Sequence, residues 1–208
     1  MVTASRWLTR IAHWLRFLLD DTGGTQIVEF AVVLPLLMVV TVGIYDFGAA
    51  FTVKEKLVTI TQTGARFGAS QPSNDLSETS LSCPQLAAVC AVRDVVDRGL
   101  VDARMNDCGL DAAAPKAGGG ADASTSWHFD ANGGGCPAGL KLIVERAYIY
   151  QAPLGAPYGA STNLQVISTR VSLSYPYQWQ FNKVIGLLGG TFNGPAQLKT
   201  IAVMQNLN

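Results

Sequence analysis

An uncharged apolar run near the N-terminus places the strongest constraint on what this chain can fold into. Residues 30–45 carry no charge, and the apolar character resumes after Asp46 and continues through residue 53. As an α-helix, residues 27–51 would reach roughly 37 Å at about 1.5 Å per residue, enough to cross a membrane core of about 30 Å with some tilt. We therefore predict a membrane-spanning helix.

The carboxylate of Glu29 lies at the threshold of this run. A glutamate at membrane depth costs free energy that leucine or alanine would not, so an acidic group in this position is a candidate functional residue. The simpler interpretation is a side chain that reaches back to the polar interface. The residues that precede Glu29 favour the functional interpretation.

Gly24 is followed by four residues and then by Glu29 and Phe30, at the head of the apolar run. This arrangement resembles the processing site of prepilins, where a membrane peptidase cuts after the glycine and leaves a glutamate as the fifth residue of the mature chain. The resemblance implies cleavage between Gly24 and Thr25, which would make Glu29 the fifth residue of the product.

Two further segments carry a more specific resemblance. Residues 31–35, Ala-Val-Val-Leu-Pro, and residues 64–69, Gly-Ala-Arg-Phe-Gly-Ala, resemble the N-terminal signature of TadE-like pseudopilins. That family belongs to the tight-adherence (Tad) apparatus, which builds Flp-type, or type IVb, pili. The resemblance is densest over residues 24–69 and weaker in the strand-like C-terminal third, and the residues between are not family-specific.

The resemblance implies a minor pseudopilin that supports assembly of a Flp-type pilus for adherence. Its implied partners are a prepilin peptidase, other pilins and pseudopilins of the Tad apparatus, and the bacterial inner membrane, with Glu29 as a contact between subunits. No catalytic residue, metal or cofactor is expected. The rival class is a single-pass, membrane-anchored periplasmic enzyme or ligand-binding protein.

The residue inventory disfavours the rival class. His128 is the only histidine beyond the leader, because His13 lies before Gly24. The chain has no G-x-S-x-G, no P-loop ending in Gly-Lys-Ser/Thr and no H-E-x-x-H. Asp107 and Asp111 form a pair of carboxylates, but the sequence does not place them in a cleft. The formal net charge is +0 and basic residues form no block, which argues against a nucleic-acid partner.

The residues before Thr25 predict the orientation in the membrane. Arg6, Arg10 and Arg16 precede the apolar run and place the N-terminus in the cytoplasm by the positive-inside rule. An ordinary secretory signal is the alternative. It is disfavoured because the apolar run is too long and no small-x-small cleavage site follows it closely.

The four cysteines all lie after the predicted anchor, on the periplasmic side, where disulfides persist. We predict a helix over residues 84–98, with Pro84 at its first position and Gly99 as its stop. Cys83 and Cys90 would then lie roughly 10 Å apart, too far for a disulfide. We therefore expect two disulfides that join Cys83 and Cys90 to the remaining pair, Cys108 and Cys136, in either of two connectivities.

Residues 106–139 are rich in glycine and alanine and are predicted to form a loop held by the disulfides. Three metal motifs were considered there and disfavoured. A zinc site using His128 with Cys108 and Cys136 lacks C-x-x-C or H-x-H spacing. The D-x-S-x-S motif of von Willebrand A domains, at residues 122–126, lacks the apolar strand that should precede it. A calcium loop starting at residue 130 lacks its terminal glutamate.

The predicted helix continues beyond the membrane and ends near Gly68, with Pro35 bending it within the span. In its extramembrane part, four residues at helical spacing would face the core: Leu57, Ile60, Gly64 and Phe67.

Two stretches of the C-terminal third are typical of strands. Residues 142–150 are rich in β-forming residues and are stopped by Pro153. Residues 171–181 place an apolar or aromatic side chain at every odd position, and Pro176 indicates an edge, a bulge or a bend. A core-facing stripe is favoured there over a carbohydrate-binding platform. Residues 198–204 are a strand or a short helix, and the resemblance favours the strand.

These elements predict an α+β fold, with a long N-terminal transmembrane helix packed on a small antiparallel-sheet, pilin-like domain and a disulfide-stapled loop insertion. The expected organisation is a cytoplasmic prepilin-type leader over residues 1–24, a transmembrane helix over 25–53 and a periplasmic domain over 54–208.

Overall fold

The computed structural model describes residues 25–72, 82–83, 85–136, 138–153, 163–179 and 197–206. The chain divides into two compact units, Met1–Gly48 with Gln180–Phe192, and Ala49–Trp179 with Asn193–Asn208. The predicted leader, including Gly24, lies outside the described residues.

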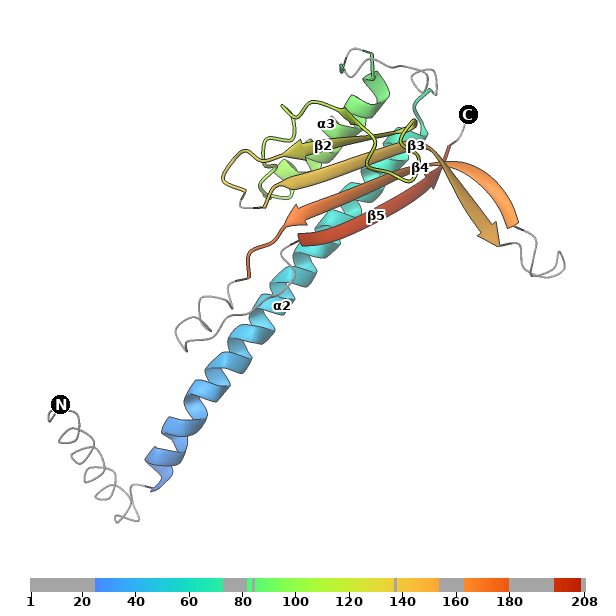
Figure 1. Cartoon of the computed structure of the whole chain (residues 1–208). Helices are drawn as coiled ribbons and strands as arrows, with labels where there is room; N and C mark the ends of the chain where they lie inside the picture. Colours follow the sequence, from blue (N-terminus) through green and yellow to red (C-terminus); the bar gives the residue numbers. More distant parts are fainter. Residues whose placement is uncertain are drawn as a thin grey trace, which may run out of the picture. The chain divides into compact units, whose positions relative to one another are not determined.

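Helix α2 is a single helix of 45 residues over Thr25–Ala69, and it continues through Pro35 (Figure 1). The predicted end near Gly68 is thus confirmed. Residues 26–69 include a window apolar enough, with mean hydropathy 2.5, for the helix to qualify by length and composition as a membrane span. The helix is therefore compatible with a single-pass membrane anchor.

The second unit contains a five-stranded antiparallel sheet in which each strand pairs with the next one in the sequence. Figure 1 shows β2 to β5 side by side. The order is β1 (Lys116–Ala117), β2 (Ser126–Ala131), β3 (Leu140–Pro153), β4 (Asn163–Pro176) and β5 (Gln197–Gln205).

The core of this unit lies between one face of the sheet and two helices, the second part of α2 and helix α3 (Ala87–Asp102). The helices contribute fully buried Leu57, Val92 and Val96, and the sheet contributes Val144 and Leu173. Three of the four residues predicted to form the core-facing stripe of α2 are buried, and Phe67 is partly buried. The α+β prediction is confirmed.

Glycines set how closely the helices approach. A Cβ added to Gly64 would lie 2.8 Å from Cγ2 of Val96 on α3, closer than real Cβ contacts come. Gly99 was predicted to stop α3, and this prediction is wrong, because the helix continues to Asp102. Gly99 instead packs against the side chain of Ile60, where an added Cβ would lie 3.1 Å from Cγ2. It is a contact residue between helices.

A buried arginine ties the end of α2 to the sheet. Arg146 is 1% exposed and sits where the register of β3 with β4 shifts, between Glu145 and Tyr148. Its Nη2 donates to the carbonyls of Gln71 and Pro72, at 3.1 and 2.8 Å, directly after the helix. Charge-assisted bonds to carbonyls are stronger than neutral ones, so Arg146 anchors the chain just after α2 to the irregular part of β3.

Residues 106–139 are more ordered than predicted, because they contain β1 and β2. Trp127, Phe129 and Ala131 alternate along β2 and are 3%, 0% and 2% exposed. This apolar alternation is the signal that the flanking glycine runs obscured.

The C-terminal strand predictions are largely confirmed. β3 contains the whole of residues 142–150, and the final segment is strand β5. β4 begins earlier than expected, at Asn163, and ends at Pro176, so the strand predicted over 171–181 is too long at its C-terminal end. Pro176 therefore terminates a strand that has neighbours on both sides, and Phe181 lies outside the described residues.

The disulfide pairing differs from the prediction. The bonds are Cys83–Cys90 and Cys108–Cys136, with Cα–Cα distances of 5.5 and 5.6 Å. The prediction failed because α3 begins at Ala87 and not at residue 84. Before the helix the chain turns, with the carbonyl of Ser82 accepting from Leu86 N at 2.9 Å. This turn brings Cys83 back over the first helical residues.

The close approach at Gly64 generates a stability prediction. Gly64→Ala gains about 1 kcal/mol of helix propensity but forces Val96 to move, at a cost of about 1–3 kcal/mol, so the free energy of unfolding should fall by about 1 kcal/mol. Guanidinium denaturation of the full chain in detergent, followed through buried Trp127, measures this change.

The matched control is Gly48→Ala, on the same helix, where no described atom lies within 4 Å of an added Cβ. It should leave the free energy of unfolding unchanged or raise it. Equal effects of the two substitutions would contradict the packing argument.

Candidate functional site

The N-terminal part of α2 carries the residues predicted to be processed and to contact other subunits. The helix begins at Thr25, the first residue of the expected product. Glu29 is exposed, and the neighbouring Phe30 is 66% exposed. Residues 25–48 contain two charged residues, Glu29 and Asp46, and Asp46 is buried. Glu29 therefore presents its carboxylate at the surface of an otherwise apolar segment.

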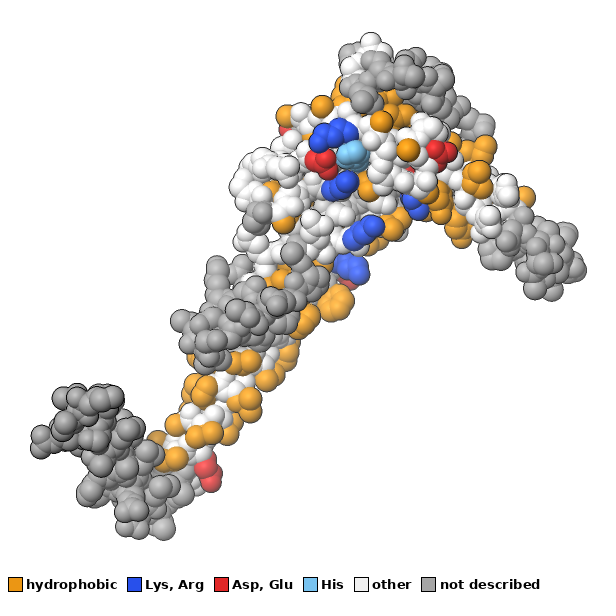
Figure 2. Space-filling model, viewed as in Figure 1, with side chains coloured by type: hydrophobic (Ala, Val, Ile, Leu, Met, Phe, Trp, Pro, Cys, Tyr) orange, Lys and Arg blue, Asp and Glu red, His pale blue; other side chains and the backbone are white. Residues whose placement is uncertain are grey.

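The apolar side chains around Glu29 are also exposed, and Figure 2 shows them in orange along the visible face of α2. Large apolar side chains on a water-facing surface would cost free energy, so this segment requires lipid or other apolar helices around it. Members more than half exposed include Ile27, Val32, Leu36, Leu37, Met38 and Ile44.

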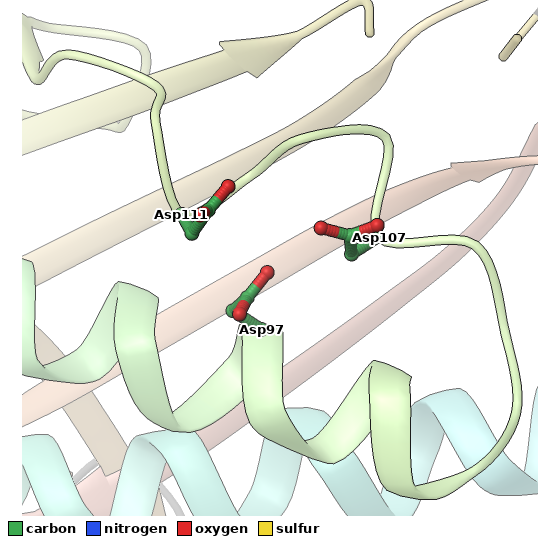
Figure 3. Close-up of side chains that lie close together, drawn as sticks. All are labelled: Asp97, Asp107 and Asp111. Carbon is green, nitrogen blue, oxygen red and sulfur yellow. The ribbon is translucent and has the colours of Figure 1, made fainter. Parts of the chain in front are cut away.

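Three carboxylates lie close together near the C-terminal half of α3. Asp97 projects from the helix, and Asp107 and Asp111 project toward it from the loop that follows (Figure 3). Their closest oxygens lie within 4.8 Å of one another. Burial, and then the charges of Asp107 and Asp111, raise the pKa of the Asp97 carboxyl. The three could offer oxygens to a hard cation, but Ca²⁺ takes six to eight.

The disulfide-held loop builds this cluster. Cys108 adopts a φ of 59° and is bonded to Cys136, while the Asn106 side chain donates to the Gly134 carbonyl at 2.6 Å. Sequence reasoning named Asp107 and Asp111 as a pair but missed Asp97. Their proximity depends on the path of the loop, which no spacing pattern encodes.

A second group of charges lies on the exposed face of the sheet, where Figure 2 shows lysine, aspartate and histidine side chains together. Asp130 accepts from Lys116 Nζ at 2.9 Å and lies 3.5 Å from His128 Nε2. The hydrogen bond from Lys116, together with the charges of Lys116, His128 and Lys141, outweighs burial and lowers the pKa of Asp130. His128 Nδ1 lies 2.9 Å from the Gly118 carbonyl, so the histidine orders the loop before β2.

The metal motifs that the sequence suggested have local structural roles. The Asp122 carboxylate accepts from Ser124 N and Oγ, at 2.9 and 2.6 Å, in an exposed turn. These bonds lower the pKa of Asp122. The sulfurs of Cys108 and Cys136 are bonded to each other and are not available as thiolate ligands for zinc.

The described part of α2 also borders a shallow groove of about 430 Å³. Its described lining residues all come from one stretch of the helix: Phe51, Lys54, Glu55, Val58 and Thr59. They include no histidine, cysteine or serine, so they offer no activated nucleophile of the usual kinds.

Comparison with protein families identifies the N-terminal segment. Residues 24–66 match the family model described as TadE-like protein. This segment is TadE-like. The resemblance predicted from Gly24 to Ala69 is thereby confirmed over nearly its whole length. Comparisons with curated proteins and with solved structures found no match.

The TadE-like segment begins at the predicted processing glycine and ends within the last turn of α2. It includes Glu29, and it also includes Gly64, which packs against α3. The acidic cluster, both disulfides and the whole sheet lie beyond it. The family match therefore describes the helix, and the remaining domain must be interpreted from its own structure.

The raised pKa of Asp97 predicts how stability changes with pH. The folded state holds the Asp97 proton to a higher pH than the unfolded state does, so this group's contribution falls as pH rises above the unfolded value of about 3.9. At pH 7 the three charges repel one another. Asp97→Asn should therefore raise the free energy of unfolding at pH 7 by up to about 1 kcal/mol, and the gain should shrink toward pH 4.

Denaturation midpoints at both pH values measure this effect. Asp122→Asn is the control, because that carboxylate has the opposite pKa shift and should give no gain at pH 7. A lower midpoint for Asp97→Asn at pH 7 would show that the cluster does not repel.

Proposed function

We propose that the chain is the precursor of a TadE-like minor pseudopilin, a non-enzymatic, single-pass subunit that supports assembly of a Flp-type pilus for adherence. The observation that carries the proposal is the family match over residues 24–66. It begins at the glycine of the proposed processing site and covers the helix that would form the anchor and the subunit contact.

In this proposal a prepilin peptidase removes the first 24 residues and exposes a new α-amino group on Thr25. The spacing from Gly24 to Glu29 supports this, and Thr25 and Glu29 both lie in α2. The subunit then lies in the bacterial inner membrane through the apolar part of α2. The leader arginines favour a cytoplasmic N-terminus, and the remaining domain lies in the periplasm.

Both disulfides support that orientation. All four cysteines are bonded in pairs, and such bonds persist in the periplasm but are rare in the cytoplasm. The domain that contains α3, the sheet and both disulfides would therefore face the oxidising compartment.

Glu29 would link one subunit to another. In a free subunit, its carboxylate loses hydration at membrane depth without a partner, and this costs free energy. In an assembly, a neighbouring Thr25 α-amino group would pair with it at low dielectric, where opposite charges attract strongly. Breaking such a pair leaves one uncompensated charge, which is strongly destabilising. The exposure of Glu29 in the single chain agrees with a contact that another molecule completes.

A non-enzymatic role agrees with the chemistry of the described residues. His128 is engaged with Gly118 and Asp130, and no cysteine is free. The acidic cluster has no described lysine, histidine or serine bonded to it that would act as nucleophile or acid. We therefore infer that assembly with other pilins and pseudopilins of the Tad apparatus is the activity of this chain.

The processing step predicts a defined N-terminus. When the chain is co-expressed with a prepilin peptidase, the membrane-extracted protein should begin at Thr25 and should be 24 residues shorter than the precursor. N-terminal sequencing and a blot measure both. Gly24→Ala should remain full-length under the same conditions, as should the unaltered chain without the peptidase. A start downstream of Ala49 would instead identify an ordinary signal peptide.

The subunit contact predicts a specific assembly defect. Glu29→Ala should leave the amount of membrane-inserted protein unchanged or slightly higher. Loss of one buried charge pair should reduce copurification with other pilins by about tenfold or more. Quantitative pull-down from detergent extracts, with counting of pili on cells, measures the effect.

Glu55→Ala is the matched control, because Glu55 is an exposed glutamate on the same helix, outside the apolar run. It should assemble normally. Normal pili in Glu29→Ala cells would make Glu29 an incidental interfacial residue.

A further inference from the structure

The two disulfides lie in opposite electrostatic environments. In each pair one cysteine is buried and the other is partly exposed: Cys90 is 4% and Cys108 0% exposed, whereas Cys83 and Cys136 are partly exposed. Solvent exposure of the cysteines therefore does not distinguish the two disulfides. The charged groups near them do.

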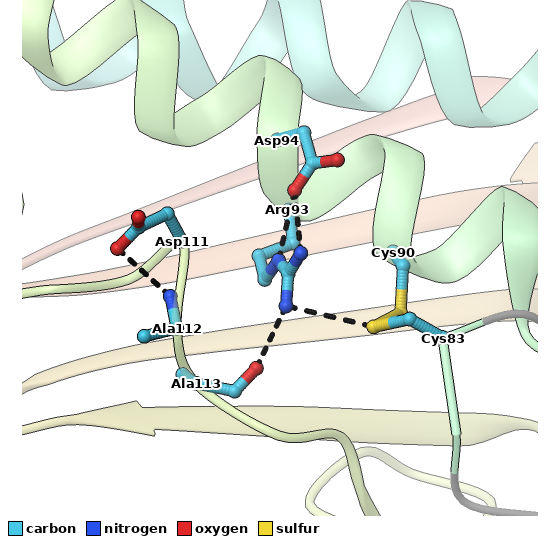
Figure 4. Close-up of polar contacts among 7 residues, drawn as sticks. All are labelled: Cys83, Cys90, Arg93, Asp94, Asp111, Ala112 and Ala113. Carbon is cyan, nitrogen blue, oxygen red and sulfur yellow. Dashed lines mark hydrogen bonds and ion pairs between the residues drawn. A yellow bond between two sulfur atoms is a disulfide. The ribbon is translucent and has the colours of Figure 1, made fainter.

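Arg93 places a positive charge beside Cys83. Figure 4 shows its guanidinium between the Cys83 sulfur and the loop at Ala113. Nη1 lies 3.5 Å from Cys83 Sγ and donates to the Ala113 carbonyl at 2.9 Å. The guanidinium carbon also lies 5.7 Å from the centre of the Phe129 ring. The loop and the ring hold the guanidinium in place independently of the sulfur.

Asp94, which is paired with the same guanidinium, offsets part of its positive charge. Asp94 accepts from Nε and Nη2 of Arg93, at 2.9 and 2.7 Å, on the edge of the guanidinium away from Nη1. The Asp111 carboxylate accepts from the backbone of Ala112. Cys83 also precedes α3, whose first turn has no side-chain cap, and the positive end of a helix dipole favours negative charge placed near it. A thiolate at Cys83 would therefore be stabilised.

The second disulfide, Cys108–Cys136, has an acidic residue next to it in the sequence, whereas the first has a basic residue close to one of its sulfurs. Cys108 directly follows Asp107, whose carboxylate belongs to the acidic cluster with Asp97 and Asp111. Negative charge nearby disfavours a thiolate, and full burial disfavours it further. Because the stability of the thiolate helps to set how readily a disulfide opens, the two bonds should differ in their exchange chemistry.

We propose that Cys83–Cys90 is a thiol–disulfide exchange site, with Cys83 as the exchanging sulfur, and that its partner is a dithiol–disulfide oxidoreductase. Cys108–Cys136 is a structural bond in the same domain. In the forming direction, the Cys83 thiolate attacks the oxidoreductase disulfide and expels one of its sulfurs as a thiolate.

Cys90 then completes the reaction. Its sulfur, after losing a proton to water, attacks Cys83 Sγ in the mixed disulfide and releases the second oxidoreductase thiolate. Two electrons pass from the cysteine pair to the oxidoreductase, which ends as a dithiol. Opening the bond is the reverse, in which the oxidoreductase dithiol attacks the sulfur of the partly exposed Cys83 and Cys90 leaves.

The first test compares the two bonds in the full-length protein in detergent. Reduced and oxidised glutathione buffers of increasing reducing strength are applied, free thiols are alkylated, and peptides are quantified by mass spectrometry. Cys83–Cys90 should open at a reducing strength about tenfold or more below that which opens Cys108–Cys136. Opening at the same reducing strength, or opening of Cys108–Cys136 first, would overturn the proposal.

The second test assigns the exchanging sulfur. In a Cys90→Ser variant, the free Cys83 thiol should react with iodoacetamide about tenfold faster at pH 7 than Cys90 reacts in a Cys83→Ser variant. Iodoacetamide is uncharged, so Arg93 cannot attract it electrostatically. Faster reaction of Cys90 would contradict the assignment.

Charge variants separate electrostatics from structure. In the Cys90→Ser background, Arg93→Gln should slow alkylation and move its pH midpoint upward, whereas Asp94→Asn should speed it. Arg98→Gln, an exposed arginine on the same helix, is the matched control and should change neither. Loss of local structure would expose Cys83 and speed alkylation in Arg93→Gln, so faster reaction of that variant would count against the proposal.

Discussion

The close contact between α2 and α3, which glycines on both helices allow, is the constraint on which the folded domain depends. Gly64 brings α2 against Val96, and Gly99 receives Ile60 in return. Because a Cβ at Gly64 would force Val96 to shift and one at Gly99 would crowd Ile60, the glycines let the two helices lie close together against one face of the sheet. Gly68 extends the same surface, where an added Cβ would lie 2.9 Å from Cγ2 of Thr169 on β4. Side-chain volume, more than polarity, determines this packing.

The sequence was most informative where periodicity and chemistry agreed. The apolar run predicted α2, and the alternation around Val171 and Leu173 predicted β4, because both patterns repeat along a single element. It failed where the outcome depended on a turn. The predicted separation of roughly 10 Å between Cys83 and Cys90 depended on a helix that begins at residue 84. The chain instead forms a turn at Ser82, and α3 begins only at Ala87. Asp97 lies close to Asp107 because of how the loop after α3 folds back, and no periodic pattern in the sequence predicts that fold.

Positive and negative side chains are unevenly distributed over the domain, and the overall composition does not show this. The formal net charge is +0, yet Arg93 lies against the sulfur of Cys83, and three carboxylates gather where Asp107 precedes Cys108. A buried ion pair between Glu145 and Arg170 lies further along the sheet, with Tyr148 stacked on the guanidinium at 4.2 Å. Local field, and not overall charge, therefore decides how each group behaves. This separation explains why two bonds between the same residue type can serve different purposes.

The strand order has a consequence for how the chain matures. Each strand pairs with the next, so the sheet can form one hairpin at a time as the chain is made. Contacts of α2 do not follow this order: the hydroxyls of Thr61 on α2 and Thr200 on β5, for example, bond at 2.7 Å across 139 positions. The contact between α2 and β5 can therefore form only after the last strand has been made. Until β5 has been made, the face of α2 that it covers in the folded domain remains exposed.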